Sequence, residues 1–249
     1  MSILLDVGAH FGQTTEIALS PKWNFSVIHA FEPSKYAYNR LTQLKSAKLH
    51  LHNFGLYTED KDIPLYNSGE VGASIYRRNL DTTPPAEIIR LVSASKWIEL
   101  NIDLKKQMFL KLNCEGSEVD ILQNLIDSGL IHEFNAIYID FDIRKFSGQE
   151  FRRELLETQL NNLKVNYSSW EEIQEVMTES EKKIPYFSFS KWLELSMPPI
   201  EPKIIDAMRY HFLLHLKMNR RLRVYIKSLL PHYILNLLRT IAKKLGAKL

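Results

Sequence analysis

The fold is decided by the stretch Ile3-Leu4-Leu5-Asp6-Val7-Gly8-Ala9-His10-Phe11-Gly12-Gln13 at the start of the chain. An apolar run ends there in an acid and a glycine-rich turn, and a helical stretch follows. A second apolar run then ends in Phe31-Glu32-Pro33. This order predicts a strand, a tight turn, a helix and a second strand, which is how a doubly wound α/β sheet begins.

The turn and two strand-final acids predict a ligand site. Gly8 and Gly12 let the backbone adopt positive φ and come close to a ligand. Asp6 lies at the carboxyl end of its strand, where open α/β sheets bind ligands. Glu32 ends the second strand, where its two oxygens could bind the two hydroxyls of a ribose. We therefore predict that these residues, together with His10, bind a nucleoside cofactor.

The spacing of the glycines argues against a dinucleotide. The dinucleotide fingerprint is G-x-G-x-x-G, whereas Gly8 and Gly12 are four residues apart and His10 takes the middle glycine position. A pyrophosphate needs backbone N–H groups close by, and a histidine obstructs that approach. S-adenosylmethionine has a ribose and no phosphate, so it suits this turn better. A strand, turn and helix with glycines for geometry alone is the alternative.

Further along, the chain predicts alternating helices and strands. We expect helices over 34–46, 95–100, 118–127 and 149–163, and strands over 48–54, 62–66, 88–92, 108–113 and 136–142. The fold class is therefore α/β, with a Rossmann-like, doubly wound, mostly parallel sheet in residues 1–165. A cap or linker segment is expected over 166–202, and a mainly helical appendage over 203–249.

Composition narrows the class of protein. The 249 residues suit one large domain or a core with an appendage, and the 45% hydrophobic content is ordinary for a globular chain. A single cysteine, Cys114, excludes an internal disulfide. We see no secretory leader and no run of about 18 apolar residues that would span a membrane. These features predict a cytoplasmic location.

A third block of sequence is Lys111-Leu112-Asn113-Cys114-Glu115-Gly116-Ser117-Glu118. Together with the Asp6–Gly12 turn and Phe31-Glu32-Pro33, it makes the chain resemble the FkbM family of S-adenosylmethionine-dependent methyltransferases over roughly residues 3–145. The family pattern is D-V-G-A-N-x-G, then F-E-P, then K-I-D-V-E-G-A-E. The resemblance implies S-adenosylmethionine as cofactor and O-methylation of an acceptor, often a sugar or natural-product hydroxyl.

Two positions depart from the family pattern. His10 stands where the family usually has Asn, and it can still form hydrogen bonds. Asn113 stands where the family usually has Asp, and an amide is neither a general base nor a good ligand for a hard cation. If relatives use that position as a base, this chain must use another group or has lost the activity.

Methyl transfer requires an aligned acceptor oxygen and a group that removes its proton. We predict Glu115, Asp140 and Asp142 as catalytic candidates, although Glu115 could instead cap a helix and the two aspartates could pair with neighbouring cations. The resemblance places Lys111, Asn113 and Glu118 in the third block, where we expect contacts with the substrate. Asn53 could bind the adenine edge or form a turn. No metal site is predicted.

The charge is divided unevenly along the chain. Residues 203–249 carry eleven basic residues and one acid, whereas the rest of the chain is acidic overall. Apolar residues recur at helical spacing in this tail, which predicts either an interfacial helix on an anionic membrane at the inner face, a helix packed on the acidic body, or a homodimer contact. A nucleic-acid partner is not expected, because the apolar stripe is too extensive.

Three functions remain open from the residues alone. The first is a methyltransferase that acts on a small molecule or glycan. The second is a non-catalytic nucleotide- or sugar-binding protein, which Asn113 suggests. The third is a nicotinamide oxidoreductase, which His10 in the glycine turn disfavours.

Overall fold

The computed structural model describes residues 1–68, 72–77, 85, 87–146 and 148–197. The main sheet has six parallel strands in the order β3-β2-β1-β7-β8-β9. The strands are β1 (Ser2–Val7), β2 (Phe25–Phe31), β3 (Leu49–His52), β4 (Gly55–Tyr57), β5 (Lys61–Leu65), β6 (Glu87–Ser93), β7 (Gln107–Leu112), β8 (Phe134–Ile139) and β9 (Tyr167–Ser169). The α-helices are α1 (Gln13–Leu19), α2 (Lys35–Leu41), α3 (Ala94–Asn101), α4 (Glu118–Asp127), α5 (Glu150–Asn162), α6 (Trp170–Glu175) and α7 (Phe187–Ser196). Short 3₁₀ helices span Pro21–Trp23, Leu130–Glu133, Asp142–Lys145 and Glu181–Lys183.

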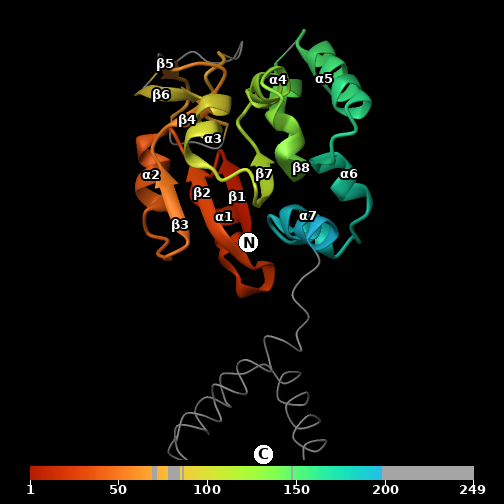
Figure 1. Ribbon diagram of the computed structural model, residues 1–249. Coiled ribbons are helices and arrows are strands. Elements are labelled where there is room, and N and C mark those ends of the chain that lie inside the picture. The colour runs from red at the N-terminus through yellow and green to blue at the C-terminus, as the bar shows by residue number, and fades with distance from the viewer. Residues whose placement is uncertain (69–71, 78–84, 86, 147, 198–249) are drawn as a thin grey trace, which may run out of the picture. The chain divides into compact units, whose positions relative to one another are not determined.

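The order of the strands reverses beside β1. The chain runs outward through β1, β2 and β3, and then returns to place β7, β8 and β9 on the other side of β1 (Figure 1). The carboxyl ends of β1 and β7 therefore form the topological switch point, which is where open α/β sheets bind their ligands. The predicted Rossmann-like parallel sheet is confirmed.

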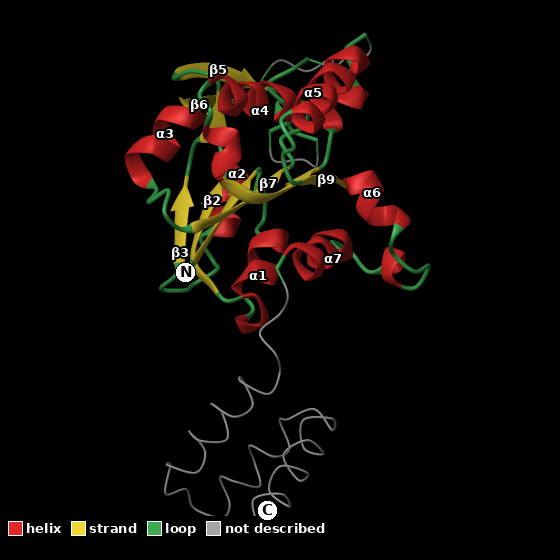
Figure 2. Cartoon of the chain, turned by 45° about the vertical axis from the view of Figure 1, so that its right-hand side comes forward, coloured by secondary structure: helices red, strands yellow, loops and turns green. Residues whose placement is uncertain are grey.

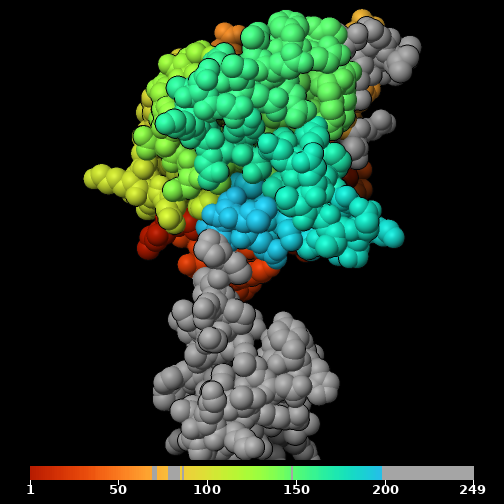
Figure 3. All heavy atoms as spheres, turned by 90° about the vertical axis from the view of Figure 1, so that its right-hand side faces the viewer, coloured from red at the N-terminus to blue at the C-terminus, as the bar shows by residue number. Residues whose placement is uncertain are grey.

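Helices cover both faces of this sheet (Figure 2). The core on one face joins the sheet to α3, α4 and α5, and the core on the other face joins it to α1 and α7. Ile3 and Leu5 belong to the first core and Leu4 to the second, because successive side chains of a strand point to opposite faces. Figure 3 shows α7 in blue beside the red and orange atoms of the first residues.

A second, three-stranded sheet has the order β4-β6-β5. Strand β4 runs parallel to β6, and β5 runs antiparallel to it. Leu65, Ile89 and Leu91 form a small apolar cluster on this sheet. The small sheet lies beyond the carboxyl ends of β2 and β3, at the same edge of the main sheet as the switch point (Figure 1).

Two predicted elements differ from the observed ones. The helix expected over 34–46 ends at Leu41, because the N–H groups of Gln43 and Leu44 bond to carbonyls only three residues back. The strand expected over 48–54 is divided into β3 and β4, which belong to different sheets. The helix expected over 149–163 is observed as α5, and a helix follows the glycine turn as predicted.

The boundary expected at residue 165 does not coincide with an edge of the fold. Strand β9 (Tyr167–Ser169) pairs with β8 and completes the main sheet, and α7 contributes Trp192 and Leu193 to the core. Much of the segment expected to be a cap is therefore part of the domain. The appendage and basic tail expected over 203–249 lie outside the described residues. Among the helices that are described, none has the length and hydropathy of a membrane span.

Candidate functional site

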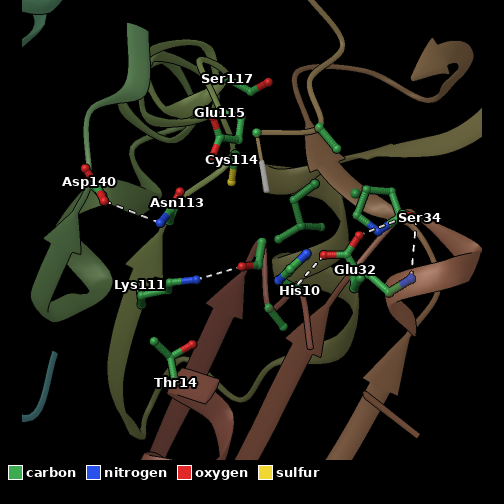
Figure 4. A pocket seen from close by; sticks show the side chains of 18 of the residues that line it. His10, Thr14, Glu32, Ser34, Lys111, Asn113, Cys114, Glu115, Ser117 and Asp140 are labelled. Carbon is green, nitrogen blue, oxygen red and sulfur yellow. Dashed lines mark hydrogen bonds between the residues drawn. The ribbon is translucent and has the colours of Figure 1, made fainter. Parts of the chain in front are cut away.

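A cleft of about 380 Å³ opens at the carboxyl ends of the central strands. Its size is typical of a site for a small molecule. Seven of the residues predicted for the site line it: Gly8, His10, Glu32, Lys111, Asn113, Glu115 and Asp140. Figure 4 shows His10, Glu32 and Ser34 on one side of it, and Asn113 and Asp140 on the other. Five predicted residues do not line it: Asp6, Gly12, Asn53, Glu118 and Asp142.

The glycine-rich turn uses its own N–H groups within the protein. Gly8 and Ala9 both donate to the carbonyl of Phe31, and the N–H of His10 donates to Glu32 Oε2 at 2.8 Å. A phosphate site in such a turn needs these groups to point at the ligand. The turn therefore presents a carboxylate to the cleft, where a dinucleotide site would present a set of amide donors.

The two glycines of the turn are required by packing. Gly8 has φ of +76°, and a Cβ there would lie 1.8 Å from the carbonyl oxygen of Asn113. At Gly12, with φ of +92°, a Cβ would lie within 3 Å of side-chain atoms of Leu41 and Leu44. Gly12 lets α2 and the residues after it pack against the turn, and it does not line the cleft, so its expected contact with the cofactor stays a prediction.

Glu32 joins two strand-end turns. Its Oε1 accepts the N–H of Ser34 at 2.8 Å, and its other oxygen holds His10. The side chain is only 7% exposed, and burial raises the pKa of Glu32 to about 7. Asn53, expected at the adenine, instead donates to the carbonyls of Glu32 and Pro33 and so fixes the same turn.

His10 occupies a left-handed backbone conformation with φ of +50°. Its ring stacks on Phe11 with 3.8 Å between centroids, and the Arg40 guanidinium lies over the Phe11 ring, 4.7 Å from its centroid. Burial, with the charges of Lys111 and Arg40, lowers the pKa of His10, so the ring is neutral at pH 7. Its buried Nε2 has no hydrogen-bond partner within the described residues, which leaves this atom for a ligand.

Asp6 and Lys111 form a buried pair below the cleft. Lys111 Nζ lies 3.0 Å from Asp6 Oδ1, and it donates to the carbonyls of Gly8 at 2.8 Å and Val7 at 3.3 Å. The other oxygen of Asp6 accepts the hydroxyls of two threonines at the start of α1, Thr14 and Thr15. Two hydrogen bonds and the ion pair hold the ammonium within the protein, so the pair anchors the glycine turn, and the direct cofactor and substrate contacts expected of the two residues stay a prediction.

The third sequence block forms a turn around Glu118. This fully buried carboxylate accepts the N–H groups of Cys114, at 2.7 Å, and of Gly116. Burial raises the pKa of Glu118 to about 8. Glu118 therefore shapes the turn and does not reach the substrate as expected. Glu115, at φ of +51°, is the carboxylate of this turn that lines the cleft.

The three catalytic candidates belong to one network of charges. Lys145 bridges Glu115 at 2.7 Å and Asp142 at 2.8 Å, and Arg144 contacts both Asp140 and Asp142. Asp142 is 2% exposed and lies outside the cleft, so it holds the two cations and is not placed for catalysis.

Asp140 is the aspartate that lines the cleft. The amide of Asn113 donates to Asp140 Oδ2 at 3.4 Å (Figure 4). Burial and the charge of Asp142 raise the pKa of Asp140, while Arg144 opposes them. Asn113 stands where the family usually has an acid. It lies beside Asp140, the acid that directly follows the neighbouring strand β8.

Two further walls enclose the cleft, and the second comes mostly from the segment expected to be a cap. One is aliphatic and comes mostly from the small sheet: Leu56, Leu65, Ile75, Ile89 and Leu91. The other is aromatic and polar and comes from β8, α6 and the start of α7: Tyr138, Trp170, Tyr186, Ser188 and Phe189. The aromatic run over 186–189 was a sequence signal for the second wall. The first has no such signal, because its residues alternate as in any half-buried strand.

Six parallel strands with a cleft at their switch point define a Rossmann-like α/β protein, and the cleft lies where such sheets bind their ligands. A family model described as the methyltransferase FkbM domain matches residues 6–182. The chain belongs to this family of methyltransferases, as its three sequence blocks predicted.

A solved structure also resembles the chain. The crystal structure of methyltransferase FkbM from Methylobacillus flagellatus KT is 17% identical, with a TM-score of 0.41. The match covers 67% of this chain and 38% of the other, so this chain corresponds to well under half of the crystallised protein. No curated protein gives a match.

Proposed function

We propose that the chain is an S-adenosylmethionine-dependent O-methyltransferase that acts on a hydroxyl of a small molecule or glycan. The observation that carries the cofactor assignment is the glycine turn, whose N–H groups are used by Phe31 and Glu32. A ligand at this turn meets a carboxylate and an imidazole, which suits ribose hydroxyls and disfavours a pyrophosphate. Family membership supports the methyltransferase class.

The residues present fit this cofactor. Each oxygen of Glu32 accepts one backbone N–H and keeps a second lone pair for a ribose hydroxyl. The unpartnered Nε2 of His10 offers a further hydrogen bond beside it. The aliphatic wall of the small sheet offers an apolar surface to a purine. When bound, S-adenosylmethionine supplies an activated methyl group on a sulfonium.

Asp140 takes the role of proton acceptor for the hydroxyl. It lines the cleft, and Arg144 and Asn113 orient its two oxygens. Glu115 also lines the cleft and is the alternative base, since Lys145 holds one of its oxygens as Arg144 holds one of those of Asp140. Asn113 cannot accept a proton at neutral pH, so its amide positions the neighbouring acid. This arrangement supports catalysis over the purely binding function that Asn113 suggested.

The test is a calorimetric titration of the protein with S-adenosylhomocysteine and, separately, with NAD⁺. We expect S-adenosylhomocysteine to bind and NAD⁺ not to bind. At pH 8, above the pKa of about 7 of Glu32, Glu32→Ala removes a charged acceptor of hydrogen bonds, so affinity for S-adenosylhomocysteine should fall by roughly 30- to 150-fold. Glu16→Ala, at an exposed acid of α1, is the control. Binding of NAD⁺ in place of S-adenosylhomocysteine would overturn the assignment.

A further inference from the structure

The outer face of α2 is basic in a domain that is otherwise acidic. Ala37 and Leu41 are buried, and Leu41 packs against Ala30 of β2. Tyr36 and Arg40 are also four residues apart, so they are neighbours on the opposite, exposed face. The chain ahead of the basic tail is acidic overall, yet the segment 33–58 has no acid and four basic residues: Lys35, Arg40, Lys45 and Lys48.

Three of these cations are exposed, and together with Tyr36 they make up what we call the α2 basic face: Lys35, Arg40 and Lys45. Within the part of the chain that the structure describes, none of the three forms an ion pair. Cations of α5 behave differently, since Arg152 and Arg153 each pair with a carboxylate. Like charges left unpaired on one surface repel one another, and a bound anion relieves that repulsion.

One acid does contact the start of α2. Glu87 accepts the backbone N–H of Lys35 at 2.8 Å and the hydroxyl of Ser68 at 2.6 Å. This carboxylate lies near the charge of Lys35 and reduces the attraction of that lysine for an anion. Arg40 and Lys45 have no such neighbour among the described contacts, so they carry most of the attraction.

Arg40 lies against two aromatic rings. Its guanidinium is 4.7 Å from the centroid of Phe11 and 5.3 Å from that of Tyr36, and the two rings meet edge to face. Such rings position a cation without neutralising its charge. Tyr36 is 50% exposed, so an amphipathic ring and a cation stand together at the surface. Tyrosine is enriched at membrane interfaces, where its ring lies at the level of the headgroups and nearby cations meet anionic lipids.

We propose that the α2 basic face binds the surface of an anionic membrane. Its cations are spread along a helix and the turn that follows, which suits the many separate phosphates of lipid headgroups better than a single phosphate ion. A nucleic-acid duplex also carries phosphates, but it offers no apolar layer to the exposed ring of Tyr36. Ala37 of the same helix lines the cleft, so a membrane bound here lies beside the ligand site.

The test is co-sedimentation of the full-length protein with vesicles at about 0.1 M salt, where exposed charges still attract one another over about 10 Å. One set of vesicles is phosphatidylcholine alone, and the other is phosphatidylcholine and phosphatidylglycerol in equal parts. We expect the protein to bind the mixed vesicles and not the neutral ones. Failure to bind the mixed vesicles, or equal binding to both sets, would overturn the proposal.

Variants then locate the contact. Arg40→Gln and Lys45→Gln should each weaken binding to the mixed vesicles about fivefold, and the double variant about 30-fold, because each removes one cation near the membrane. Lys96→Gln removes an exposed lysine of α3 and is the matched control, which should bind like the wild type. Wild-type binding by the double variant would place the contact in another part of the chain, such as the basic tail. An equal loss in Lys96→Gln would mean that net charge alone attracts the protein. Either result contradicts the proposal, as does tighter binding to duplex DNA than to the vesicles at the same salt.

Salt dependence separates the role of the ring from that of the charges. Salt screens exposed charges, so the defect of Arg40→Gln should shrink as salt rises from about 0.05 M to about 0.3 M. Burial of an aromatic ring is not screened, so the defect of Tyr36→Ala should persist over the same range. Phe151→Ala, at a ring of α5 that is 56% exposed, should show no defect. A defect of Arg40→Gln that does not change with salt would rule out the electrostatic contact, and normal binding by Tyr36→Ala would rule out the interfacial ring.

Discussion

Asp6 and Lys111 face each other across neighbouring strands, although 104 residues separate them in the chain. Each belongs to a sequence block that predicts a ligand site, yet the pair is buried and its charges are used within the protein. A charge pair in this position anchors the backbone of Val7 and Gly8 through their carbonyls. The charges of these two motif residues thus hold the glycine turn in place from below the cleft.

The glycine turn also depends on the absence of a side chain at Gly8. Gly8→Ala places a methyl group against the carbonyl oxygen of Asn113 in a backbone conformation that alanine disfavours. We expect the free energy of unfolding to fall by about 2–5 kcal/mol. Gly129→Ala is the matched control, because Gly129 has nearly the same φ and nothing within 4 Å of its added Cβ.

The control should lose only about 1–2 kcal/mol, which is the strain of the left-handed conformation. Chemical denaturation of both variants measures the difference. If the two variants lose the same stability, the close approach of β7 to Gly8 does not constrain the turn.

Asp140 is the residue on which turnover should depend. Asp140→Asn keeps the size of the side chain and removes its ability to accept a proton, so kcat should fall by about 10²- to 10⁴-fold. Affinity for S-adenosylhomocysteine should not change, because the residue lies at the other end of the cleft from Glu32 (Figure 4). The measurement is release of S-adenosylhomocysteine with an acceptor that the wild type methylates.

Glu115→Gln is the comparison for Asp140→Asn, because both acids line the cleft. A larger loss of kcat in Glu115→Gln than in Asp140→Asn would transfer the role of base to Glu115.

Among the elements, α6 has the clearest local signal for its position. Ser169 ends β9 and accepts the N–H of Glu172, whose side chain in turn accepts the N–H of Ser169. This capping box sets the direction of the chain at Trp170, the first residue of the helix. Ser169→Ala should lower the free energy of unfolding by about 0.5–2 kcal/mol, as measured by urea denaturation.

Glu172→Gln is the matched control for the cap, because glutamine can fill the same position of a capping box. Its stability should remain close to that of the wild type. A loss in Glu172→Gln as large as in Ser169→Ala would mean that charge, and not the reciprocal hydrogen bonds, stabilises this end of α6.

At the scale of the whole molecule, two buried acids and two half-buried histidines contribute to the dependence of stability on pH. Burial raises the pKa of Glu32 to about 7 and that of Glu118 to about 8. Burial also lowers the pKa of His29 and His52 to about 4. Between pH 4.5 and 6.5, unfolding releases protons from the two acids and adds protons to the two histidines, so their effects oppose each other.

As the pH rises past 6.5, His29 and His52 lose their protons in the unfolded state as well, so their opposing effect fades while the acids still release protons on unfolding. The contribution of these groups to stability should therefore fall as the pH rises from 6.5 to 8, by about 2 kcal/mol from Glu118 alone. Melting temperatures measured across this range test it. Glu118→Gln should remove much of the decline, because one amide oxygen can accept both N–H groups that Glu118 Oε1 accepts.

Glu99→Gln, at an exposed acid of α3, is the control and should keep the decline. A decline that persists unchanged in Glu118→Gln would show that this carboxyl is ionised in the folded protein throughout the range.

The sequence by itself determined the main sheet, most of its helices and the region of the site. Strands and helices follow from periodicity, and ligand sites follow from strand ends and glycine turns, so β1, α1, β2, β7 and α4 could be predicted locally. Strand β9 could not be predicted, because three residues are too few to show a period. The aliphatic wall was missed for a related reason: its strands look like any others until β6 pairs with β4 and β5.

Only the tertiary structure decided which polar residues face the cleft. Five carboxylic acids lie near strand ends, and the sequence alone does not distinguish their roles: Asp6, Glu32, Glu118, Asp140 and Asp142. Burial and partners separate them: Asp6 meets Lys111 across the sheet, Glu118 meets the amides of its own turn, and Asp140 lines the cleft. Because a carboxylate takes its role from the donors packed around it, and those donors come from distant segments, sequence spacing cannot assign that role.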